Sequence, residues 1–491
     1  MVKLIKGNIP IALGPIVFIF LQLNGPFGGM SPQALAVLST TSWMGIWWVF
    51  EIIPISVTAL LPIVLFPLTG GLDLASTAAA YGHKYIFLYM GGFMIAIAIE
   101  KWNLHKRIAL NIIDFVGTDI NRIVLGFMLA TAFLSMWISN TATAVMMLPI
   151  GVSIVKVLID NPNTIENETK IFGKMLMLSI AYSASIGGLA TLVGTPPNLV
   201  LAGVISEVYG IEISFTQWFI LGLPISIMLL LVGWIFLTRY AFQLELKTFP
   251  GGRDEILRIK KDLGPIRYEE KWVAYIFAIT AFCWISRTYL IQPFLPEIDD
   301  TIIAMIFGIS LFLIPSSDKQ QKILLWDEAV KMPWGIILLF GGGMALARGF
   351  EFSGLAKWMG DQIIFIQNLP LLIMLLIVIT FVNFLTEITS NLATTAMILP
   401  ILASIAIQLD VHPYSLLVGA AIAASCAFML PVATPPNAVV FGSGYLKISD
   451  MVKRGFVLNI FSIGLILVVI YFLLPLLWDF DPSRFPLKFK L

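Results

Sequence analysis

The sequence predicts an all-α polytopic membrane protein built from two inverted repeats. Of its 491 residues, 58% are hydrophobic and only 12% are charged, whereas a soluble domain carries roughly 25% charged residues. The polar pair Ser-Asn occurs twice, in WISNTATAVMMLP from Trp137 and in EITSNLATTAMILP from Glu387. Each pair is followed by an apolar run and a proline, which indicates two related halves.

Long apolar stretches have the length of membrane spans, because a helix needs roughly 20 residues to cross about 30 Å of hydrocarbon. Examples are residues 9–23, 86–99, 213–237, 334–347 and 456–477. Lys3 and Lys6 precede the first stretch, as in a signal peptide, but no small-x-small cleavage site follows them. We therefore interpret the first stretch as a retained span.

The most hydrophilic interior stretch is 239–271, which contains eight Lys and Arg residues. Because Lys and Arg collect in cytoplasmic loops, we interpret it as a cytoplasmic linker between two halves. The other basic residues that should then be cytoplasmic are Lys101, Lys106, Arg107, Lys319, Lys322, Lys331, Lys447, Lys453 and Arg454. All of these residues fall on the cytoplasmic side if the two segments with Ser-Asn motifs enter the membrane and turn back on the same side. Each segment is about 35 residues long, too long for one span and short for two.

The order of motifs is the same in both halves. YMGGFMIAIA from Tyr89 corresponds to LFGGGMALAR from Leu339, and GTPPN from Gly194 corresponds to ATPPN from Ala433. The loop assignment places the first hairpin inside and the second outside, so the repeats are inverted. Inverted repeats with interrupted helices are typical of secondary transporters.

The Ser-Asn and Thr-Pro-Pro steps predict breaks in the helices, because proline lacks an amide hydrogen and Ser, Thr and Asn compete for backbone hydrogen bonds. Broken backbone at membrane depth survives only where protein or a watery cavity satisfies it. Freed carbonyls and side-chain oxygens suit a small hard cation, and helix N-termini suit an anion. The two predicted clusters contain Ser139, Asn140 and Thr141 with Thr195, and Ser390 and Asn391 with Thr434. The alternative is a purely structural role, in which these small polar residues only permit close helix packing.

Other function classes find little support. Cys283 and Cys426 lie in apolar runs, so no disulfide framework or Cys-based metal site is expected, and no basic block indicates nucleic acid. The three histidines, His83, His105 and His412, fall at predicted loop or span ends; we expect none to be buried. An intramembrane enzyme would need an acid pair, a Ser/His pair or a metal cluster. Glu387 is either a functional acid or a hairpin carboxylate held by local amides or water.

With these motifs, the sequence resembles the divalent anion:sodium symporter family, the INDY-type dicarboxylate transporters, over nearly the whole chain. The resemblance implies a homodimer in the cell membrane, with about eleven spans and two re-entrant hairpins per protomer. It further implies an elevator-type transport domain, Na+ as coupling ion, and C4 dicarboxylates such as succinate, malate and fumarate as cargo. The implied ranges are 1–84 for N-terminal scaffold helices, 85–212 for the first repeat core, 213–334 for connecting scaffold helices, 335–446 for the second repeat core and 447–491 for the last span and tail.

The resemblance also implies site residues. The first sodium site would use Ser135, Ser139, Asn140 and Gly194, and the second Thr386, Thr389, Asn391 and Ala433. The substrate carboxylates would contact Asn140, Thr141, Pro196, Asn391, Thr434 and Pro435. One departure is Leu392, which stands where the family often has threonine, so a hydroxyl donor to one carboxylate is absent there.

The residues themselves favour sodium symport over exchange. The site regions 135–148, 187–202, 386–399 and 425–441 contain no Lys, Arg or His, so bound cations are the expected neutralisers of a dianion. The alternatives are a sodium-independent dicarboxylate exchanger, a carrier of citrate or sulfate, and a channel. A continuous pore, however, needs no helix breaks that close a site between repeats.

Overall fold

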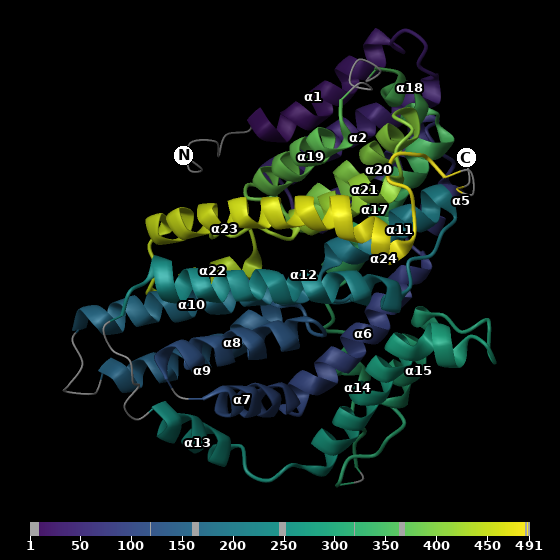
Figure 1. Cartoon of the computed structure of the whole chain (residues 1–491). Helices are drawn as coiled ribbons and strands as arrows, with labels where there is room; N and C mark the ends of the chain where they lie inside the picture. Colours follow the sequence, from purple (N-terminus) through teal and green to yellow (C-terminus); the bar gives the residue numbers. More distant parts are fainter. Residues whose placement is uncertain are drawn as a thin grey trace.

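The computed structural model describes residues 9–117, 119–159, 166–244, 252–318, 320–362, 369–486 and 489. These residues form an all-helical molecule (Figure 1), as predicted. Within them, the pairing of β type is an isolated bridge between Pro315 and Lys322. Lys3, Lys6, Lys319 and positions 245–251 of the predicted linker lie outside the described residues.

The helices follow the predicted order of motifs. The N-terminal helices are α1 (Ile9–Asn24), α2 (Pro32–Phe50), α3 (Ile55–Thr58), α4 (Leu61–Thr69) and α5 (Leu74–Ala80). The first repeat contains α6 (Lys84–Lys101), α7 (Leu104–Val116), α8 (Ile120–Ser135), α9 (Asn140–Ile159), α10 (Glu166–Gly188) and α11 (Pro196–Tyr209). The connecting part contains α12 (Phe215–Ile235), the π-helix η2 (Phe236–Ala241), α13 (Gly252–Asp262), α14 (Tyr268–Ser286), the π-helix η3 (Arg287–Ile291), α15 (Asp300–Ser310) and α16 (Trp326–Ala329).

The second repeat contains α17 (Trp334–Phe352), α18 (Leu355–Gln362), α19 (Leu371–Leu385), α20 (Asn391–Gln408), α21 (Pro413–Ala424) and α22 (Pro435–Phe441). The last helices are α23 (Ile448–Val468), the π-helix η5 (Val469–Leu473) and α24 (Leu474–Trp478). Both repeats therefore run through a long helix, a short helix, a hairpin and a broken helix. In Figure 1, α9 ends and α10 begins at the left of the molecule, whereas α18, which leads into the second hairpin, lies at the right. The two hairpins enter from opposite ends, as inverted repeats require.

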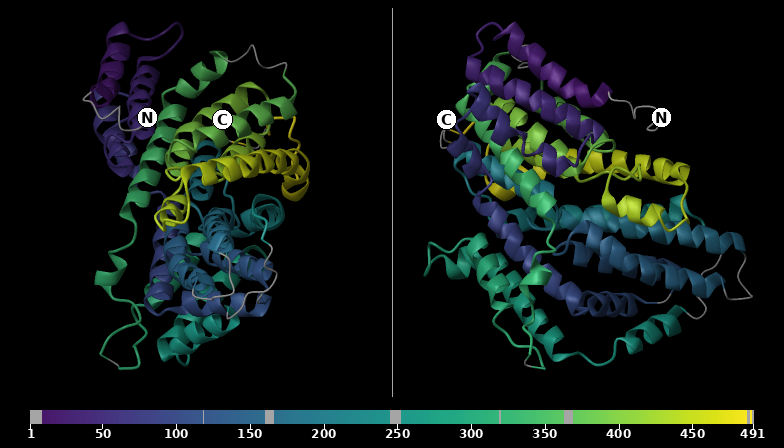
Figure 2. Two further views of the ribbon diagram at one scale, coloured as in Figure 1. Left: turned by 90° about the vertical axis from the view of Figure 1, so that its left-hand side faces the viewer. Right: turned by 180° about the vertical axis from the view of Figure 1, so that it is seen from behind.

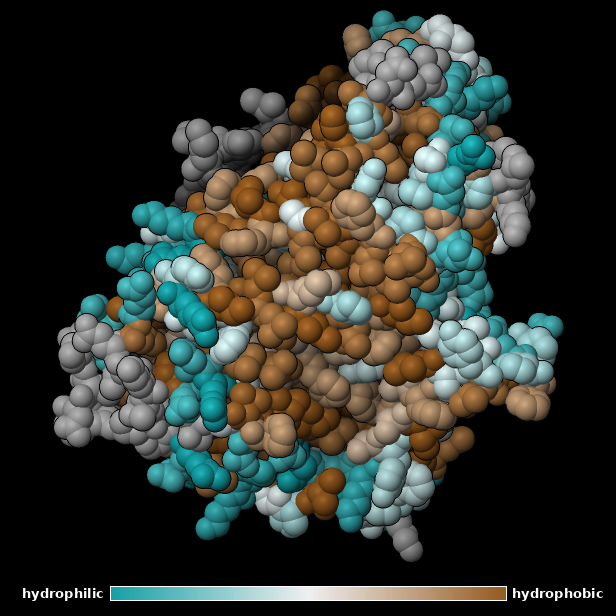
Figure 3. All heavy atoms as spheres, in the orientation of Figure 1, coloured by the Kyte–Doolittle hydropathy of each residue, from teal (hydrophilic) through white to brown (hydrophobic). Residues whose placement is uncertain are grey.

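The helices have the composition of membrane spans. The described part of the chain contains eight helices that are long and apolar enough to cross a membrane. Large apolar side chains such as Phe115, Phe294 and Leu476 are mostly exposed. Figure 3 shows an apolar band across the middle of the molecule, with hydrophilic residues gathered toward its left and right edges. A lipid bilayer around this band would cover the exposed apolar side chains.

Local capping explains where several helices begin. Ser31 Oγ accepts a hydrogen bond from Ala34 N at the start of α2, and Ser214 Oγ accepts one from Gln217 N at the start of α12. A Ser at this position satisfies one of the main-chain N–H groups that the first turn leaves free. The long apolar helices are thus punctuated by short polar residues at their ends.

The helix α17 lies between the N-terminal helices and the rest of the molecule. It packs against α2 to α6 on one side and against α11 and α20 on the other, and the views of Figure 2 show it between the N-terminal helices and the remainder. Charged residues on different helices are paired: Arg348 Nε lies 2.6 Å from Glu207 Oε1, and Lys174 Nζ lies 2.9 Å from Asp450 Oδ2. Pairing reduces the cost of placing charges among apolar helices.

The prediction that no histidine is buried is wrong. His105 and His412 are each only 4% exposed, although they do lie at helix starts. His412 accepts a hydrogen bond from Tyr414 N at the start of α21, and its ring packs against Phe480 and Phe489. A ring that caps a helix can be covered by neighbouring aromatic side chains, which the sequence alone does not reveal. The described residues contain no group of three or more His, Cys, Asp or Glu side chains that could hold a metal ion.

Candidate functional site

The Ser-Asn motifs form the tips of the two hairpins. Asn140 is the first residue of α9, and Asn391 is the first residue of α20. Ser390 has an extended backbone before α20, and Ser139 Oγ accepts a hydrogen bond from Ala142 N in the first turn of α9. Each motif therefore marks the residue at which the chain turns and the second arm begins.

The same arrangement of oxygens lies behind both tips. Ser135 Oγ lies 2.6 Å from Asn140 Oδ1 and 2.6 Å from the main-chain oxygen of Ala184. In the second repeat, Thr386 Oγ1 lies 2.7 Å from Asn391 Oδ1 and 2.9 Å from the main-chain oxygen of Ala424. A hydroxyl has a single hydrogen to donate, so three oxygens converge in each cluster around one proton.

The first cluster includes a fourth oxygen. The Asn140 amide faces the main-chain oxygens of Gly194 and Ala184, each 3.1 Å away. These contacts are hydrogen bonds if the amide presents its nitrogen, and they form a group of four oxygens if it presents Oδ1. Oxygen groups of this kind suit a hard monovalent or divalent cation. The residues present therefore fit a bound Na+.

Each broken helix ends and restarts in the same way. α10 ends at Gly188 and α11 begins at Pro196, and α21 ends at Ala424 and α22 begins at Pro435. The residues before the prolines have nearly identical extended backbones, with φ and ψ of −142° and 141° at Thr195 and of −139° and 148° at Thr434. Proline is favourable at the first helical position because no hydrogen bond needs its missing N–H there.

At the site, helices of each repeat pack against helices of the other repeat. The hairpin arm α9 of the first repeat packs against α22 of the second, and the arm α20 of the second repeat packs against α11 of the first. Both breaks and both tips consequently face one shared space. The two clusters belong to a single site rather than to two separate ones.

A cavity of about 610 Å³ opens between the tips and the breaks. All six predicted substrate residues line it: Asn140, Thr141, Pro196, Asn391, Thr434 and Pro435. Of the predicted sodium residues, Ser139, Asn140, Asn391 and Ala433 also line it, whereas Ser135, Gly194, Thr386 and Thr389 do not. Ser135 and Thr386 are fully buried, so the oxygen clusters lie beneath the cavity wall and share Asn140 and Asn391 with it.

The side chain of Thr389 is engaged within its own hairpin. Its Oγ1 donates to the main-chain oxygen of Leu385 at 2.9 Å and contacts Thr394 Oγ1. These contacts direct the hydroxyl to the hairpin rather than to Asn391. The corresponding residue of the first repeat is Ile138, which has no hydroxyl, whereas Ser139 and its counterpart Ser390 both line the cavity.

The described residues that line the cavity include no basic side chain. Glu51 is the charged residue in the lining, at the end of α2, where its backbone is in the left-handed region with φ 46°. The lining is otherwise made of uncharged polar and apolar residues. A dianion in this cavity would therefore find no fixed positive charge among the lining residues.

Glu387 is held by local amides, one of the two interpretations that the sequence left open. Its Oε1 accepts hydrogen bonds from Phe428 N at 2.7 Å, Met429 N at 3.0 Å and Asn459 Nδ2 at 2.7 Å. Its Oε2 accepts from Leu430 N at 3.1 Å. The carboxylate, only 3% exposed, thus fastens the second tip to the second break. Met136 holds the corresponding place after Ser135 in the first repeat.

Sequence reasoning missed several residues of the site. The carbonyls of Ala184 and Ala424 complete the oxygen clusters, but a main-chain oxygen leaves no trace in the sequence. Asn198 and Asn437, the last residues of the Thr-Pro-Pro-Asn motifs, are fully buried and donate to carbonyls of the breaks. Their repetition in both halves was the signal that could have identified them.

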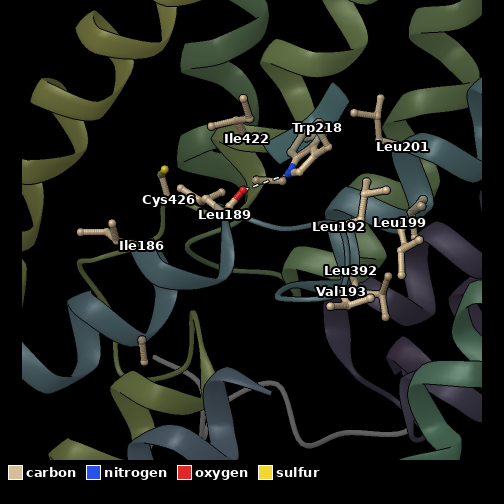
Figure 4. Packing of buried hydrophobic residues seen from close by; sticks show 14 of the residues in the cluster. Ile186, Leu189, Leu192, Val193, Leu199, Leu201, Trp218, Leu392, Ile422 and Cys426 are labelled. Carbon is tan, nitrogen blue, oxygen red and sulfur yellow. Dashed lines mark hydrogen bonds between the residues drawn. The ribbon is translucent and has the colours of Figure 1, made fainter. Parts of the chain in front are cut away.

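Leu392 also belongs to the site. It lines the cavity yet is only 6% exposed, and it is part of the same buried apolar cluster as Leu192 and Val193 of the first break (Figure 4). Its counterpart Thr141 is exposed in the cavity. The two half-sites consequently present a hydroxyl on one side and an apolar side chain on the other.

Comparison with known proteins identifies relatives along the whole chain. A family model described as "Sodium:sulfate symporter transmembrane region" matches residues 6–478. The sodium-dependent dicarboxylate transporter SdcS of Staphylococcus saprophyticus is 46% identical over 484 residues, which cover 97% of this chain and 93% of that protein. The SdcS protein of Staphylococcus aureus is 44% identical over 488 residues, covering 98% and 94%.

Two solved structures have a similar fold. The Neisseria gonorrhoeae MtrF structure, described as one of a class of antimetabolite efflux pumps, matches with a TM-score of 0.57 and 11% identity, covering 82% of this chain and 84% of that one. The Alcanivorax borkumensis YdaH transporter matches with a TM-score of 0.55 and 12% identity, covering 85% and 88%. At this identity the similarity concerns the fold alone.

Proposed function

Since the chain belongs to the sodium:sulfate symporter transmembrane family, we propose that it is a secondary transporter that couples sodium entry to the uptake of C4 dicarboxylates. Succinate, malate and fumarate are the proposed cargo. The relatives at 44% to 46% identity carry the name of sodium-dependent dicarboxylate transporters. The protein is a multi-pass membrane transporter and not an enzyme.

One observation carries this proposal most directly: two oxygen clusters lie behind a cavity without a basic side chain. Sodium bound in the clusters would supply the positive charge that the cavity lining lacks. Asn140 and Asn391 belong to both the clusters and the lining. In the proposed site each asparagine would therefore contact a sodium ion and a carboxylate, which couples the binding of the two.

The proposed sodium ligands are Ser135, Ser139, Asn140 and Gly194 in the first half-site and Thr386, Thr389, Asn391 and Ala433 in the second. For Thr389 the available group is its main-chain oxygen, because the hydroxyl is engaged with Leu385 and Thr394. The helix starts at Asn140 and Asn391 would present main-chain N–H groups toward the substrate. The starts at Pro196 and Pro435 would contribute only the positive ends of their helix dipoles, because each begins with two prolines that lack an N–H. Fixed donors at both ends of the cavity suit a ligand with two carboxylates.

We further propose that two copies form a homodimer and that the hairpins and broken helices move together as an elevator. The ranges 85–212 and 335–446 would supply the moving core, and 1–84 and 213–334 most of the static scaffold. The helix α6 is an exception, because it packs mainly against α15 and also against α14, which supports its assignment to the scaffold. The molecular mass of the protein in detergent, corrected for bound detergent, measures the oligomeric state.

The test of the proposed function is uptake into proteoliposomes that contain the purified protein. Labelled succinate, malate, fumarate, citrate and sulfate are each supplied with and without an inward sodium gradient. We expect the three C4 dicarboxylates to accumulate only with the gradient, and citrate and sulfate to accumulate weakly. Preferential accumulation of citrate or sulfate would replace the substrate assignment and leave sodium symport intact.

The substitution Leu392→Thr is expected to change the ranking of C4 dicarboxylates against shorter and longer dianions. It places a hydroxyl in the cavity lining at the position that corresponds to Thr141 of the first repeat, and one hydrogen bond contributes about 0.5 to 1.5 kcal/mol. Competition of unlabelled dianions against labelled succinate measures the ranking. Leu392→Val, which shortens the side chain without adding a donor, is the matched control. The same ranking in the Thr variant and the wild type would mean that this position does not contact the substrate.

A further inference from the structure

The two asparagines that end the Thr-Pro-Pro-Asn motifs have no contact with the cavity. Asn198 lies in the first turn of α11 and Asn437 in the first turn of α22, and both are fully buried. Neither lines the cavity between the hairpin tips. Their side chains point instead into the breaks that precede the two half-helices.

Asn198 holds the first break closed. Its Nδ2 donates to the main-chain oxygens of Thr191 at 2.7 Å, Gly188 at 3.2 Å and Leu189 at 3.4 Å. The two ends of the break touch each other, because a Cβ atom added to Gly194 would lie 2.5 Å from the oxygen of Gly188. One side-chain amide thus gathers three carbonyls of a closed loop.

This loop carries an oxygen of the first cluster. The main-chain oxygen of Gly194 lies 3.1 Å from the Asn140 amide, and a Cβ atom added to Gly188 would lie 2.5 Å from Asn140 Oδ1. The position of the Gly194 oxygen therefore depends on the path of the chain between Gly188 and Gly194. Asn198 fixes that path from the opposite side of the loop.

The second break is held by an asparagine and also by a carboxylate, and the first break has no counterpart of that carboxylate. Asn437 Nδ2 donates to the oxygens of Leu430 at 3.0 Å and Ala427 at 3.2 Å. In addition, Glu387 accepts hydrogen bonds from the N–H groups of residues 428–430. The first repeat has Met136 where the second has Glu387. Besides Asn198, the first break is held by single hydrogen bonds, from Trp218 Nε1 to Leu189 O at 3.0 Å (Figure 4) and from Thr191 Oγ1 to Met136 O.

In the part of the chain that the structure describes, the side-chain oxygens of the two asparagines have no partner, which indicates that these residues serve as hydrogen-bond donors through Nδ2. Asn198 Oδ1 and Asn437 Oδ1 are both buried and have no hydrogen-bond partner among the described residues. A buried acceptor without a partner is unfavourable, and a leucine would fill the space without it. An unpaired Oδ1 nevertheless occurs at the same motif position in both repeats, and in both the Nδ2 atom donates to main-chain oxygens of the break.

We propose that Asn198 and Asn437 are positioning residues for the two cation clusters, and that sodium affinity depends more strongly on Asn198 than on Asn437. The inference rests on the proposed sodium-coupled function. Asn198 acts through the loop that presents the Gly194 oxygen. Asn437 acts on a loop that Glu387 already holds, so its loss is partly compensated.

The test measures initial uptake of labelled succinate as a function of sodium concentration, in proteoliposomes that contain the full chain. For Asn198→Leu we expect the half-saturating sodium concentration to rise up to about tenfold, and for Asn437→Leu about two- to threefold, as the loss of one or part of one hydrogen bond predicts. The maximal rate at saturating sodium should remain near that of the wild type. Asn198→Ser retains one donor and should give an intermediate shift.

Ser226→Ala is the matched control. It removes a buried hydrogen bond of 2.9 Å from Ser226 Oγ to the oxygen of Ile186, just before the break, and should leave the half-saturating sodium concentration unchanged. Sodium-dependent stabilisation of each purified variant against heat provides a second readout that does not require transport. If Asn198→Leu fails to fold, Asn198→Ser decides the question.

The outcomes separate this inference from the proposed function. A wild-type protein that transports succinate equally well without sodium would refute the proposed function itself. A sodium-dependent wild type together with unchanged half-saturation in Asn198→Leu and Asn198→Ser would overturn the positioning role. A lower maximal rate with unchanged sodium dependence would overturn it as well, because that result indicates only a structural role.

Discussion

Replacing Asn140 or Asn391 with alanine should reduce sodium-driven dicarboxylate uptake to near the background of empty liposomes. Each side chain contributes to an oxygen cluster and to the cavity lining. Alanine therefore removes a ligand for the cation and a donor for the carboxylate at once. Because the two half-sites act on one substrate, loss of either should be as severe as loss of both, which is the non-additivity expected of residues that act as a unit.

The measurement is initial uptake of labelled succinate by Asn140→Ala, Asn391→Ala and the double variant. Gel filtration and thermal unfolding of the purified proteins test whether they are folded. Ser404→Ala is the matched control on α20, where it removes the hydrogen bond from Ser404 Oγ to Pro400 O at 2.9 Å away from the cavity lining; it should transport like the wild type. Normal uptake by either single asparagine variant would remove the basis for a site shared between two half-sites.

Replacing sodium with potassium should abolish uptake, and an interior negative potential should accelerate it. Among the residues that the structure describes, the cavity lining has no basic side chain and includes Glu51, while the buried carboxylate of Glu387 follows Thr386 directly. A dianion without compensation at membrane depth costs at least about 2.5 to 3.5 kcal/mol on insertion scales. Cations must therefore bind before or with the substrate, and more than two per dianion would carry net positive charge inward.

Uptake is measured in sodium or potassium buffer, and potassium gradients with valinomycin set the membrane potential in sodium buffer. Liposomes without protein and liposomes preloaded with unlabelled succinate are the controls. Uptake at full rate in sodium-free buffer, strictly coupled to the exit of internal succinate, would establish a sodium-independent exchanger instead. A rate that does not respond to potential would mean that the coupled step is electroneutral.

The hairpins and breaks were predictable from sequence because the residues that interrupt a helix are few and chemically distinct. Ser139 and Asn140 have polar side chains next to an apolar run, and Pro196 and Pro435 lack the N–H that a continuous helix needs. These features recur in the same order in each half, so the order of motifs alone is enough to pair the two breaks. The structure places all six predicted substrate residues around one cavity.

The remaining parts of the site depend on contacts that no local pattern records. The oxygens of Ala184 and Ala424 come from ordinary helical residues whose side chains contribute nothing to the clusters. The hydrogen bonds that Glu387 accepts from the N–H groups of residues 428–430 join positions about forty residues apart. Two predicted loop-end histidines proved to be buried because aromatic side chains or a neighbouring helix cover them. Tertiary packing decides such details, whereas composition decides only where the chain bends.

The packing of helices of one repeat against helices of the other constrains how the protein can be assembled. When the first repeat has been inserted into the membrane, α9 still lacks α22, and α11 still lacks α20. The opened backbone at 189–195 then has no second half to close the cavity over it. Assembly of the site must therefore wait until the C-terminal third of the chain has been synthesised. Until then the first repeat is held by contacts within itself, such as the packing of α10 against α8 and α9 and the hydrogen bonds of Asn198 within its own broken helix.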